Sequence, residues 1–193
     1  YSAELCDRYI DSLIQEIHIV GSQHAEHRKA TSLYFGGGTP ALAANRIKEI
    51  VNALSEHFII TEGIGLELHP DNVNVETLQM LKDAGVTKTS IGIQSFCDKY
   101  QKILGRKKID TAEMMSALSA VSFETVSMDF IFALPGQTYD DLKSDIDTAF
   151  LLGANHVAIY PFIDFTFTES PVTAMPKKDK RELLDAITQY CLG

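Results

Sequence analysis

The sequence predicts an α/β protein built around a parallel sheet, and three observations support this prediction. Short apolar runs rich in Ile, Val, Phe or Tyr recur along the chain, and most are bounded by Gly, Pro or a polar residue. Between these runs, apolar residues recur every three to four positions, as on one face of a helix. Alternating strands and helices of this kind form a parallel sheet with right-handed crossovers, either an open doubly wound sheet or a (β/α) barrel.

Five apolar runs are expected to be strands. Several of them are apolar at consecutive positions, which predicts a sheet that is covered on both faces. The runs are Ser32–Phe35, Ile64–Leu68, Thr87–Ile93, Met128–Leu134 and His156–Tyr160.

The helices are predicted from apolar stripes, and their ends from capping residues. Asp110 and Thr138 each stand three residues before an acidic residue, as in a capping box. Gly85 and Gly153 follow the ends of predicted helices, where a left-handed residue is favoured. The stripes are Leu13, Ile14 and Ile17 in an opening helix, Ile47, Ile50, Val51 and Leu54 in a second, and Leu142, Ile146 and Phe150 in a later one.

The expected order is therefore one helix followed by five strand–helix units. A chain of 193 residues corresponds to about one domain at roughly 150 residues per domain, so residues 1–193 are expected to form a single domain. Gly21–Thr31 is expected to be a polar connection, and Asp164–Pro176 an irregular loop.

Composition excludes several classes of partner. The chain has 17 Lys and Arg against 26 Asp and Glu and a net charge of −9, which argues against nucleic acid or anionic lipid as the main partner. It lacks the run of about 18 apolar residues that a membrane span needs. The three cysteines (Cys6, Cys97 and Cys191) are far apart, which favours free thiols in a reducing, cytoplasmic compartment.

Polar residues follow the predicted strands, at the point where each strand ends. Because ligands of parallel α/β folds bind beyond the carboxyl ends of the strands, these residues are the candidates for a site. The segments concerned are Gly36–Pro40, Glu67–Pro70, Gln94–Phe96, Pro135–Thr138 and Tyr160–Pro161, together with Asp129 inside the fourth strand.

The run Gly36-Gly37-Gly38 is the sharpest of these features. Glycines permit a positive φ and allow a ligand to approach the backbone without meeting a Cβ atom. The run matches neither the dinucleotide fingerprint nor the phosphate loop, and Pro40 follows at once. The alternative interpretation is a tight turn between a strand and a helix.

Four polar side chains lie where chemistry is expected, and each also has a structural interpretation. Glu67 and Asp129 stand in apolar strands, where a carboxylate must be paired or bound, either by a ligand or in a buried ion pair. Gln94 suits hydroxyl or amino-acid groups, or a bond to a neighbouring strand. Arg106 can hold a carboxylate in a bidentate fashion, or remain a solvated surface charge.

The sequence offers no metal-ligand or nucleophile motif. His24 and His27 lie in a polar stretch without cysteines or carboxylates at ligand spacing, so they are interpreted as solvated and no metal ligand is predicted. The cysteines form no Cys-x-x-Cys pair, and no G-x-S-x-G motif is present.

Taken together, five motifs in this order resemble a known family. They resemble the radical S-adenosylmethionine proteins of the oxygen-independent coproporphyrinogen III oxidase group, which includes related heme chaperones. The motifs cover nearly the whole chain and are Tyr34-Phe35-Gly36-Gly37-Gly38-Thr39-Pro40, Glu67-x-His69-Pro70, Ser90–Phe96, Gly105-Arg106 and Asp129–Thr138.

The resemblance implies an incomplete (β/α)6 barrel of the TIM type, with S-adenosylmethionine held at its top. It implies roles for eight residues of this chain. Gly37, Gly38 and Thr39 would receive the methionine amino group, Glu67 would lie against the methionine moiety, and Arg106 would pair with the carboxylate. Gln94 and Asp129 would bond the ribose or neighbouring polar atoms, and Pro161 would lie beside the adenine.

The chain departs from the family pattern in three places. The Cys-x-x-x-Cys-x-x-Cys loop that binds a [4Fe–4S] cluster, and the first barrel strand, would precede the helix that begins near Ser2. The chain is therefore expected to be N-terminally incomplete, with five parallel strands, outer helices and no cluster ligand of its own. Lys107-Lys108-Ile109 stands where a histidine is usual, and Pro161–Phe165 also differs, which bears on the substrate.

The resemblance implies an enzyme that, when the cluster segment is present, cleaves S-adenosylmethionine to a 5′-deoxyadenosyl radical. It implies a porphyrinogen or heme as the small-molecule partner and a reductase as electron donor. The alternatives are a heme-trafficking chaperone without oxidase activity, a radical methyltransferase on the same barrel, or a βα barrel with unrelated chemistry. The chain as given is expected to be catalytically silent.

Overall fold

The computed structural model describes residues 2–23, 28–163 and 174–192, and its centre is a five-stranded parallel sheet. The strand order is β2-β4-β5-β6-β7, and every neighbouring pair is parallel. These strands confirm the predicted parallel sheet. Their bounds are β2 Leu33–Phe35, β4 Ile64–Leu68, β5 Lys88–Gln94, β6 Thr125–Phe132 and β7 His156–Pro161.

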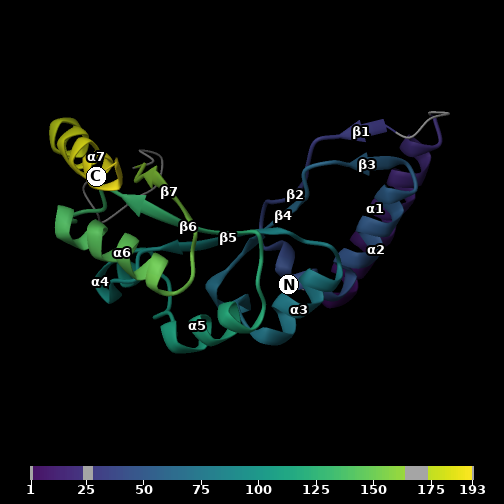
Figure 1. The fold of residues 1–193 in the computed structure, drawn as a ribbon, viewed down its shortest axis with the longest axis horizontal. Coiled ribbons are helices and arrows are strands. Elements are labelled where there is room, and N and C mark those ends of the chain that lie inside the picture. The colour runs from purple at the N-terminus through teal and green to yellow at the C-terminus, as the bar shows by residue number, and fades with distance from the viewer. Residues whose placement is uncertain (1, 24–27, 164–173, 193) are drawn as a thin grey trace.

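Helices alternate with these strands along the chain. Figure 1 shows α3, α5 and α6 on one side of the sheet. The helices are α1 Ala3–Gly21, α2 Ala44–Ser55, α3 Val75–Asp83, α4 Asp98–Ile103, α5 Thr111–Ala120, α6 Tyr139–Leu151 and α7 Lys177–Leu192, with short 3-10 turns at Pro40–Ala43 and Pro70–Asn72. His24, His27 and most of the expected loop Asp164–Pro176 lie outside the described residues.

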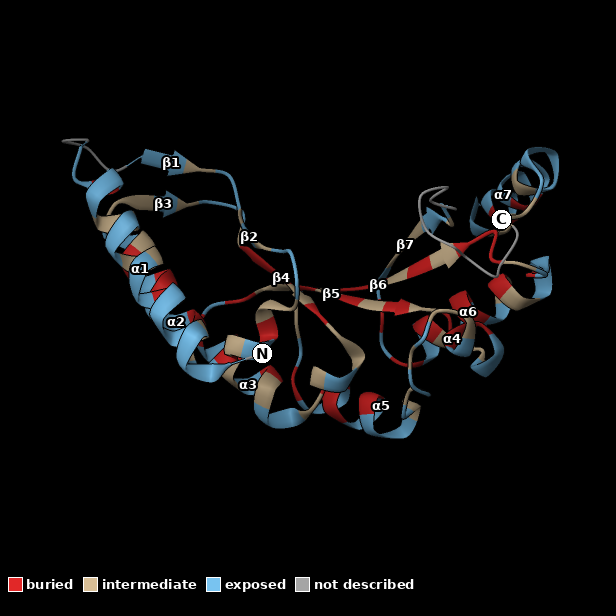
Figure 2. Ribbon diagram, turned by 180° about the vertical axis from the view of Figure 1, so that it is seen from behind, coloured by how far each residue is buried: buried red, intermediate tan, exposed pale blue. Residues whose placement is uncertain are grey.

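The strands are apolar on one face only, which corrects the prediction of a sheet covered on both faces. Along β5, Thr89, Ile91 and Ile93 are buried, whereas the residues between them are only half-buried. Because side chains alternate along a strand, the first set faces the helices and the second faces the opposite side. The buried stretches of β4, β5 and β6 are visible in Figure 2. The prediction failed because Ser90 and Gly92, which alternate with the buried residues of β5, are small and gave no clear polar signal.

Two short strands were not predicted. β1 (Arg28–Ala30) lies in the stretch expected to be a connection, and it pairs in parallel with β3 (Phe58–Ile60). The ladder continues toward β2 and β4 through the bond from the Thr61 amide to the Ala30 carbonyl (3.0 Å). A three-residue strand is too short to show a period, and its pairing depends on a partner distant in sequence.

The predicted helix ends are confirmed. Thr138 and Asp141 form a reciprocal capping box at the start of α6. Gly85 and Gly153 have φ angles of 91° and 105°, so both adopt the left-handed conformation expected after a helix. Asp110 accepts bonds from two amides of the first turn of α5.

The first two helices are joined by a charged clamp. Arg46 on α2 donates to Asp7 (3.1 Å) and Asp11 (2.8 Å) on α1, and to Glu49 one turn along its own helix (2.7 Å). These carboxylates raise the pKa of the Arg46 guanidinium, chiefly through the bond to Glu49. The clamp orients α1 against α2 next to the edge strand β2. No helix in the described part of the chain is both long and apolar enough to cross a membrane.

A buried carboxylate fixes the turn that follows β5. Asp145 on α6 is 3% exposed, and it accepts bonds from the Ser95 hydroxyl (2.7 Å) and the Phe96 amide (2.7 Å). Burial raises the pKa of Asp145 to about 6, although both hydrogen bonds favour the ionised form. The turn is therefore held by a group whose charge is costly at neutral pH.

This carboxylate predicts a pH-dependent difference in stability for Asp145→Asn. The folded-state pKa of about 6 exceeds the unfolded value of about 3.9, so wild-type stability from this group is fully present below about pH 4 and is lost as pH rises through 6. Relative to wild type, the free energy of unfolding of the variant should therefore increase between pH 4 and 7, by at most about 3 kcal/mol. Urea unfolding across this range measures the difference.

Asp140→Asn is the matched control, because Asp140 is an exposed carboxylate on the first turn of the same helix. Its difference from wild type should not follow the same pH profile. A difference between Asp145→Asn and wild type that stays constant from pH 4 to 7 would contradict the assignment.

Candidate functional site

A polar cleft lies at the carboxyl ends of the sheet strands. It has a volume of about 310 Å³, at the lower end of the range of ligand sites. Its lining comes from the turn after β2, from β4, β5, β6 and β7, and from the segment after α4. The lining residues are Gly38, Thr39, Glu67, Leu68, His69, Ser90, Gly92, Gln94, Arg106, Asp129 and Tyr160.

Six of the eight predicted site residues line this cleft together. Gly37 and Pro161 do not line it, although each is the chain neighbour of a residue that does. Pro161 ends β7 and is exposed, and Tyr160 takes its expected place in the lining. The six that converge are Gly38, Thr39, Glu67, Gln94, Arg106 and Asp129.

The glycine turn leaves the backbone accessible at the mouth of the cleft. Gly37 has a φ of 101°, which a residue with a side chain rarely adopts. A Cβ atom placed on Gly37 or Gly38 would meet nothing within 4 Å, so both face open space. Gly36 is different, because a Cβ there would lie 3.2 Å from Oε1 of Glu67. The absence of side chains therefore allows a ligand to approach the backbone of Gly37 and Gly38, and allows the Glu67 carboxylate to pack against Gly36.

The Glu67 carboxylate faces the cleft without a counter-ion. None of the ion pairs among residues 2–23, 28–163 and 174–192 includes Glu67 or Asp129. The interpretation of these two acids as buried ion pairs is therefore not supported. Burial, followed by the charge of Glu67, raises the pKa of the nearby Tyr34 phenol. The phenol thus stays neutral beside a region of negative potential.

Asp129 is held by hydroxyl groups from two strands. The Ser90 hydroxyl donates to Oδ2 at 2.6 Å, and the Ser127 hydroxyl lies 3.3 Å from Oδ1. Ser127 in turn lies 2.9 Å from Nδ1 of His156 on β7. This network orients the carboxylate across β5, β6 and β7. Neither serine was predicted, because an isolated serine in a strand carries no sequence signal of its own.

The backbone at Gln94 is strained. Gln94 has a φ of 71°, and the register between β5 and β6 shifts between Ile91 and Gln94. A left-handed conformation costs a residue with a side chain about 1–2 kcal/mol. A Cβ on Gly92 would lie 3.0 Å from Nε2 of Gln94, so the glycine makes room for this amide. Strain of this kind is concentrated at functional sites.

Arg106 is anchored to the same strand. Its Nη1 donates to the Gly92 carbonyl at 2.8 Å, and the side chain lines the cleft. Burial lowers the pKa of Arg106, opposed by the charge of Asp71, but an arginine remains charged at neutral pH. The site thus combines two carboxylates, one guanidinium, an amide and a glycine turn. Such a set suits a ligand carrying ammonium, carboxylate and hydroxyl groups together.

The sequence of the chain matches a known protein superfamily and is similar to several characterised proteins. The model of the Radical SAM superfamily matches residues 7–149. The chain is 33% identical over 162 residues to the heme chaperone HemW of Lactococcus lactis, covering 81% of this chain and 41% of that protein. It is 25% identical over 177 residues to an oxygen-independent coproporphyrinogen III oxidase of Pseudomonas aeruginosa, covering 88% and 37%. The chain thus spans less than half the length of these relatives.

A solved structure shows the same fold. The coproporphyrinogen III oxidase HemN of Escherichia coli, described as a radical SAM enzyme, matches with a TM-score of 0.81 and 23% identity. The match covers 95% of this chain and 45% of that chain. At this identity the likeness concerns the fold, and it confirms the prediction of a partial TIM-like barrel.

The strained backbone predicts different stabilities for two substitutions of Gln94. Gln94→Gly removes the amide and relieves the positive φ, whereas Gln94→Ala removes the amide and keeps the strain. The glycine variant should be the more stable of the two by about 1 kcal/mol, since relief of about 1–2 kcal/mol exceeds the entropic cost of glycine of about 0.5–1 kcal/mol. Urea unfolding measures both; an alanine variant more stable than the glycine variant would show that Gln94 carries no backbone strain.

Proposed function

Because the chain belongs to the Radical SAM superfamily, we propose that its cleft binds S-adenosylmethionine. The observation that carries this proposal is the convergence of Glu67, Asp129 and Arg106 with the glycine turn in one cleft. S-adenosylmethionine presents an ammonium, a carboxylate and ribose hydroxyls. A site with acids, a guanidinium and an accessible backbone has a complementary group for each.

The residues present fit the ligand group by group. The open backbone at Gly37 and Gly38, with Thr39 and the unpaired Glu67, suits the ammonium end. Arg106 suits the carboxylate, because its guanidinium is held at the cleft by the Gly92 carbonyl.

The same fit extends to the nucleoside end of the ligand. Asp129, oriented by Ser90, and the amide of Gln94 suit the ribose hydroxyls. Tyr160 lines the cleft on β7, and we assign the adenine to this end, beside Pro161.

We assign the protein, when a cluster is supplied, to the radical enzymes. When bound, S-adenosylmethionine reduced by a [4Fe–4S] cluster supplies a 5′-deoxyadenosyl radical that abstracts hydrogen from a substrate. The residues of this chain bind and orient the cofactor and limit access of water to it. We propose that the cluster is not ligated by the cysteines of this chain, and that residues 1–193 form one domain.

The three cysteines of the chain support this proposal. Cys6 lies on α1, Cys97 precedes α4, and Cys191 lies on α7. All three are free thiols, and within the described residues the His, Cys, Asp and Glu groups close enough to share a metal include none of them. A cluster needs three or four thiolates in one place. Free thiols also fit a reducing compartment, so we propose a cytoplasmic protein. We propose a reductase as the electron donor to the cluster, because reductive cleavage of S-adenosylmethionine consumes an electron.

The substrate class we propose is a porphyrinogen or heme. The oxidase relatives and the oxidase HemN support turnover of a porphyrinogen. The relatives named as heme chaperones support a second candidate function, heme binding without oxidase activity, since one of them has the higher identity of 33%. Heme titration into the full-length protein, followed by its Soret band, separates these two functions. S-adenosylhomocysteine among the products would instead indicate methyl transfer.

The cofactor assignment predicts weaker binding for Asp129→Ala. In the full-length protein with its cluster, calorimetry should show a loss of about 1–3 kcal/mol in the binding free energy of S-adenosylmethionine, the usual cost of losing a hydrogen bond to a charged group. Asp98→Ala is the control, because Asp98 is an exposed acid on α4 outside the cleft. Unchanged affinity in the Asp129 variant, with a native melting profile, would exclude the proposed role.

The distribution of cysteines predicts that the 193-residue chain alone has no radical S-adenosylmethionine activity. After anaerobic reconstitution with iron and sulfide, it should bind no stoichiometric cluster, and with dithionite it should release no 5′-deoxyadenosine. The full-length protein treated in the same way is the control. A stoichiometric cluster with turnover in the 193-residue chain would mean that Cys6, Cys97 and Cys191 act together after all.

A further inference from the structure

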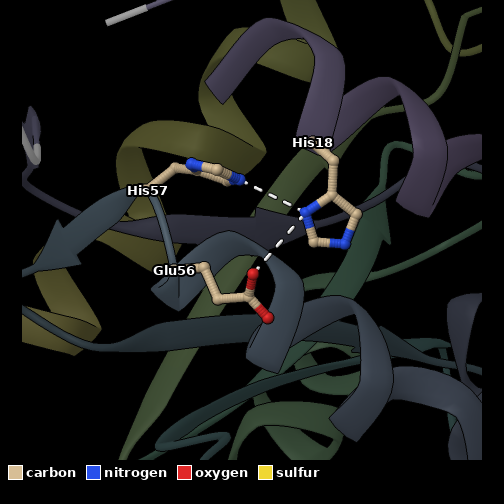
Figure 3. Close-up of side chains that lie close together, drawn as sticks. All are labelled: His18, Glu56 and His57. Carbon is tan, nitrogen blue, oxygen red and sulfur yellow. Dashed lines mark hydrogen bonds and ion pairs between the residues drawn. The ribbon is translucent and has the colours of Figure 1, made fainter. Parts of the chain in front are cut away.

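A second group of polar side chains lies at the opposite end of the fold from the cleft. His18 lies in the last turn of α1, and Glu56 and His57 directly follow α2. They therefore stand before β3, at the amino ends of the strands, whereas the cleft lies at the carboxyl ends. Figure 3 shows the two imidazole rings and the carboxylate turned toward one another. The proposed function uses none of these residues.

The spacing of their ligand atoms is that of a metal site. Nδ1 of His18 lies 3.2 Å from Nε2 of His57 and 3.7 Å from Oε2 of Glu56. All three ligand atoms lie within 4.8 Å of one another. Two ligands at about 2.05 Å from a tetrahedral zinc lie about 3.3 Å apart, so only a small adjustment separates this arrangement from a coordinated ion.

The fold holds His57 in place for this contact. A Cβ atom on Gly21, at the end of α1, would lie 2.1 Å from Cγ of His57, so the ring packs directly over the glycine backbone. The His57 amide donates to the Leu54 carbonyl (3.0 Å), and its carbonyl accepts from the Arg28 amide of β1 (3.2 Å). The ring is thus brought to α1 by the ends of a helix and a strand, and is not a freely rotating surface side chain.

The electrostatics of the position favour a cation. The carbonyl groups at the ends of α1 and α2 give each helix a partial negative charge there, and the Glu56 carboxylate adds a full one. Two imidazoles and a carboxylate are borderline ligands that suit zinc, and they leave a fourth position for water. His18 and Glu56 are 43% and 64% exposed, so an ion has access from solvent.

We propose that His18, Glu56 and His57 form a zinc site that staples the end of α1 to the end of α2. The ion takes the place of the contact between the two imidazoles. The site lies at the amino ends of the strands, away from the cleft. Its role is therefore structural: it holds α1 in place against α2, beside the edge strand β2. The assignment does not depend on the proposed cofactor cleft.

The test is a calorimetric titration of Zn²⁺ into the 193-residue chain after removal of metal by a chelator. We expect a single site in the wild type, and at least about tenfold weaker binding in His18→Gln and in Glu56→Gln, since loss of even an outer partner of a metal ligand costs about 10–100-fold. These two exposed residues are chosen because His57 packs on Gly21 and its replacement threatens the fold. Zinc should also raise the melting temperature of the wild type by more than that of either variant at the same zinc concentration.

Two further arms decide which ligands are used. The double variant His24→Gln/His27→Gln should bind Zn²⁺ as the wild type does. Co²⁺ in place of Zn²⁺ should give no thiolate charge-transfer band, because the site contains no cysteine. Unchanged affinity in His18→Gln and Glu56→Gln, loss of binding in the His24/His27 variant, or a thiolate band would each overturn the proposal.

Discussion

The structure depends on the alternation of side chains along its parallel strands. On β6, Met128 and Phe130 point to the helices and are fully buried, while Asp129 between them points to the other face. Residues that stabilise the core therefore alternate along each strand with residues that line the cleft. A shift of one residue in register would bury the carboxylate among the helices and expose the two apolar side chains. Core and site are therefore specified together.

Strong local patterns explain what the sequence could predict. Each of the five sheet strands contains enough Ile, Leu, Val, Phe or Met to be recognised alone, and a carboxylate such as Glu67 is conspicuous inside such a run because its burial is costly. Ser90 and Ser127 carry no such signal. Ser90 meets Asp129, 39 residues further along the chain, only in the fold, and Ser127 is an isolated serine on the same strand as Asp129. β1 and β3 were missed for the same reason, since their pairing is entirely non-local.

The turns at the carboxyl ends of β5 and β6 contain features that cost folding free energy. Gln94 and Ala133, which end or follow β5 and β6, are the described non-glycine residues with positive φ. Next to Gln94, the buried Asp145 carries a charge that burial makes unfavourable at neutral pH. Strained backbone and a desolvated acid are both costs to folding, and both occur at the turns that follow the carboxyl ends of β5 and β6. The apolar face toward the helices is what allows these turns to tolerate them.

The edge of the sheet has a consequence for how the chain behaves in solution. β2 and, through the extended ladder, β1 form an edge with no strand paired on its outer side among the described residues. An edge of this kind is a template for intermolecular pairing and aggregation. Two features limit that hazard: each strand has three residues, and β1 begins with the cations Arg28 and Lys29. Like charges brought together would repel, so the edge is protected from self-association by its brevity and its charge.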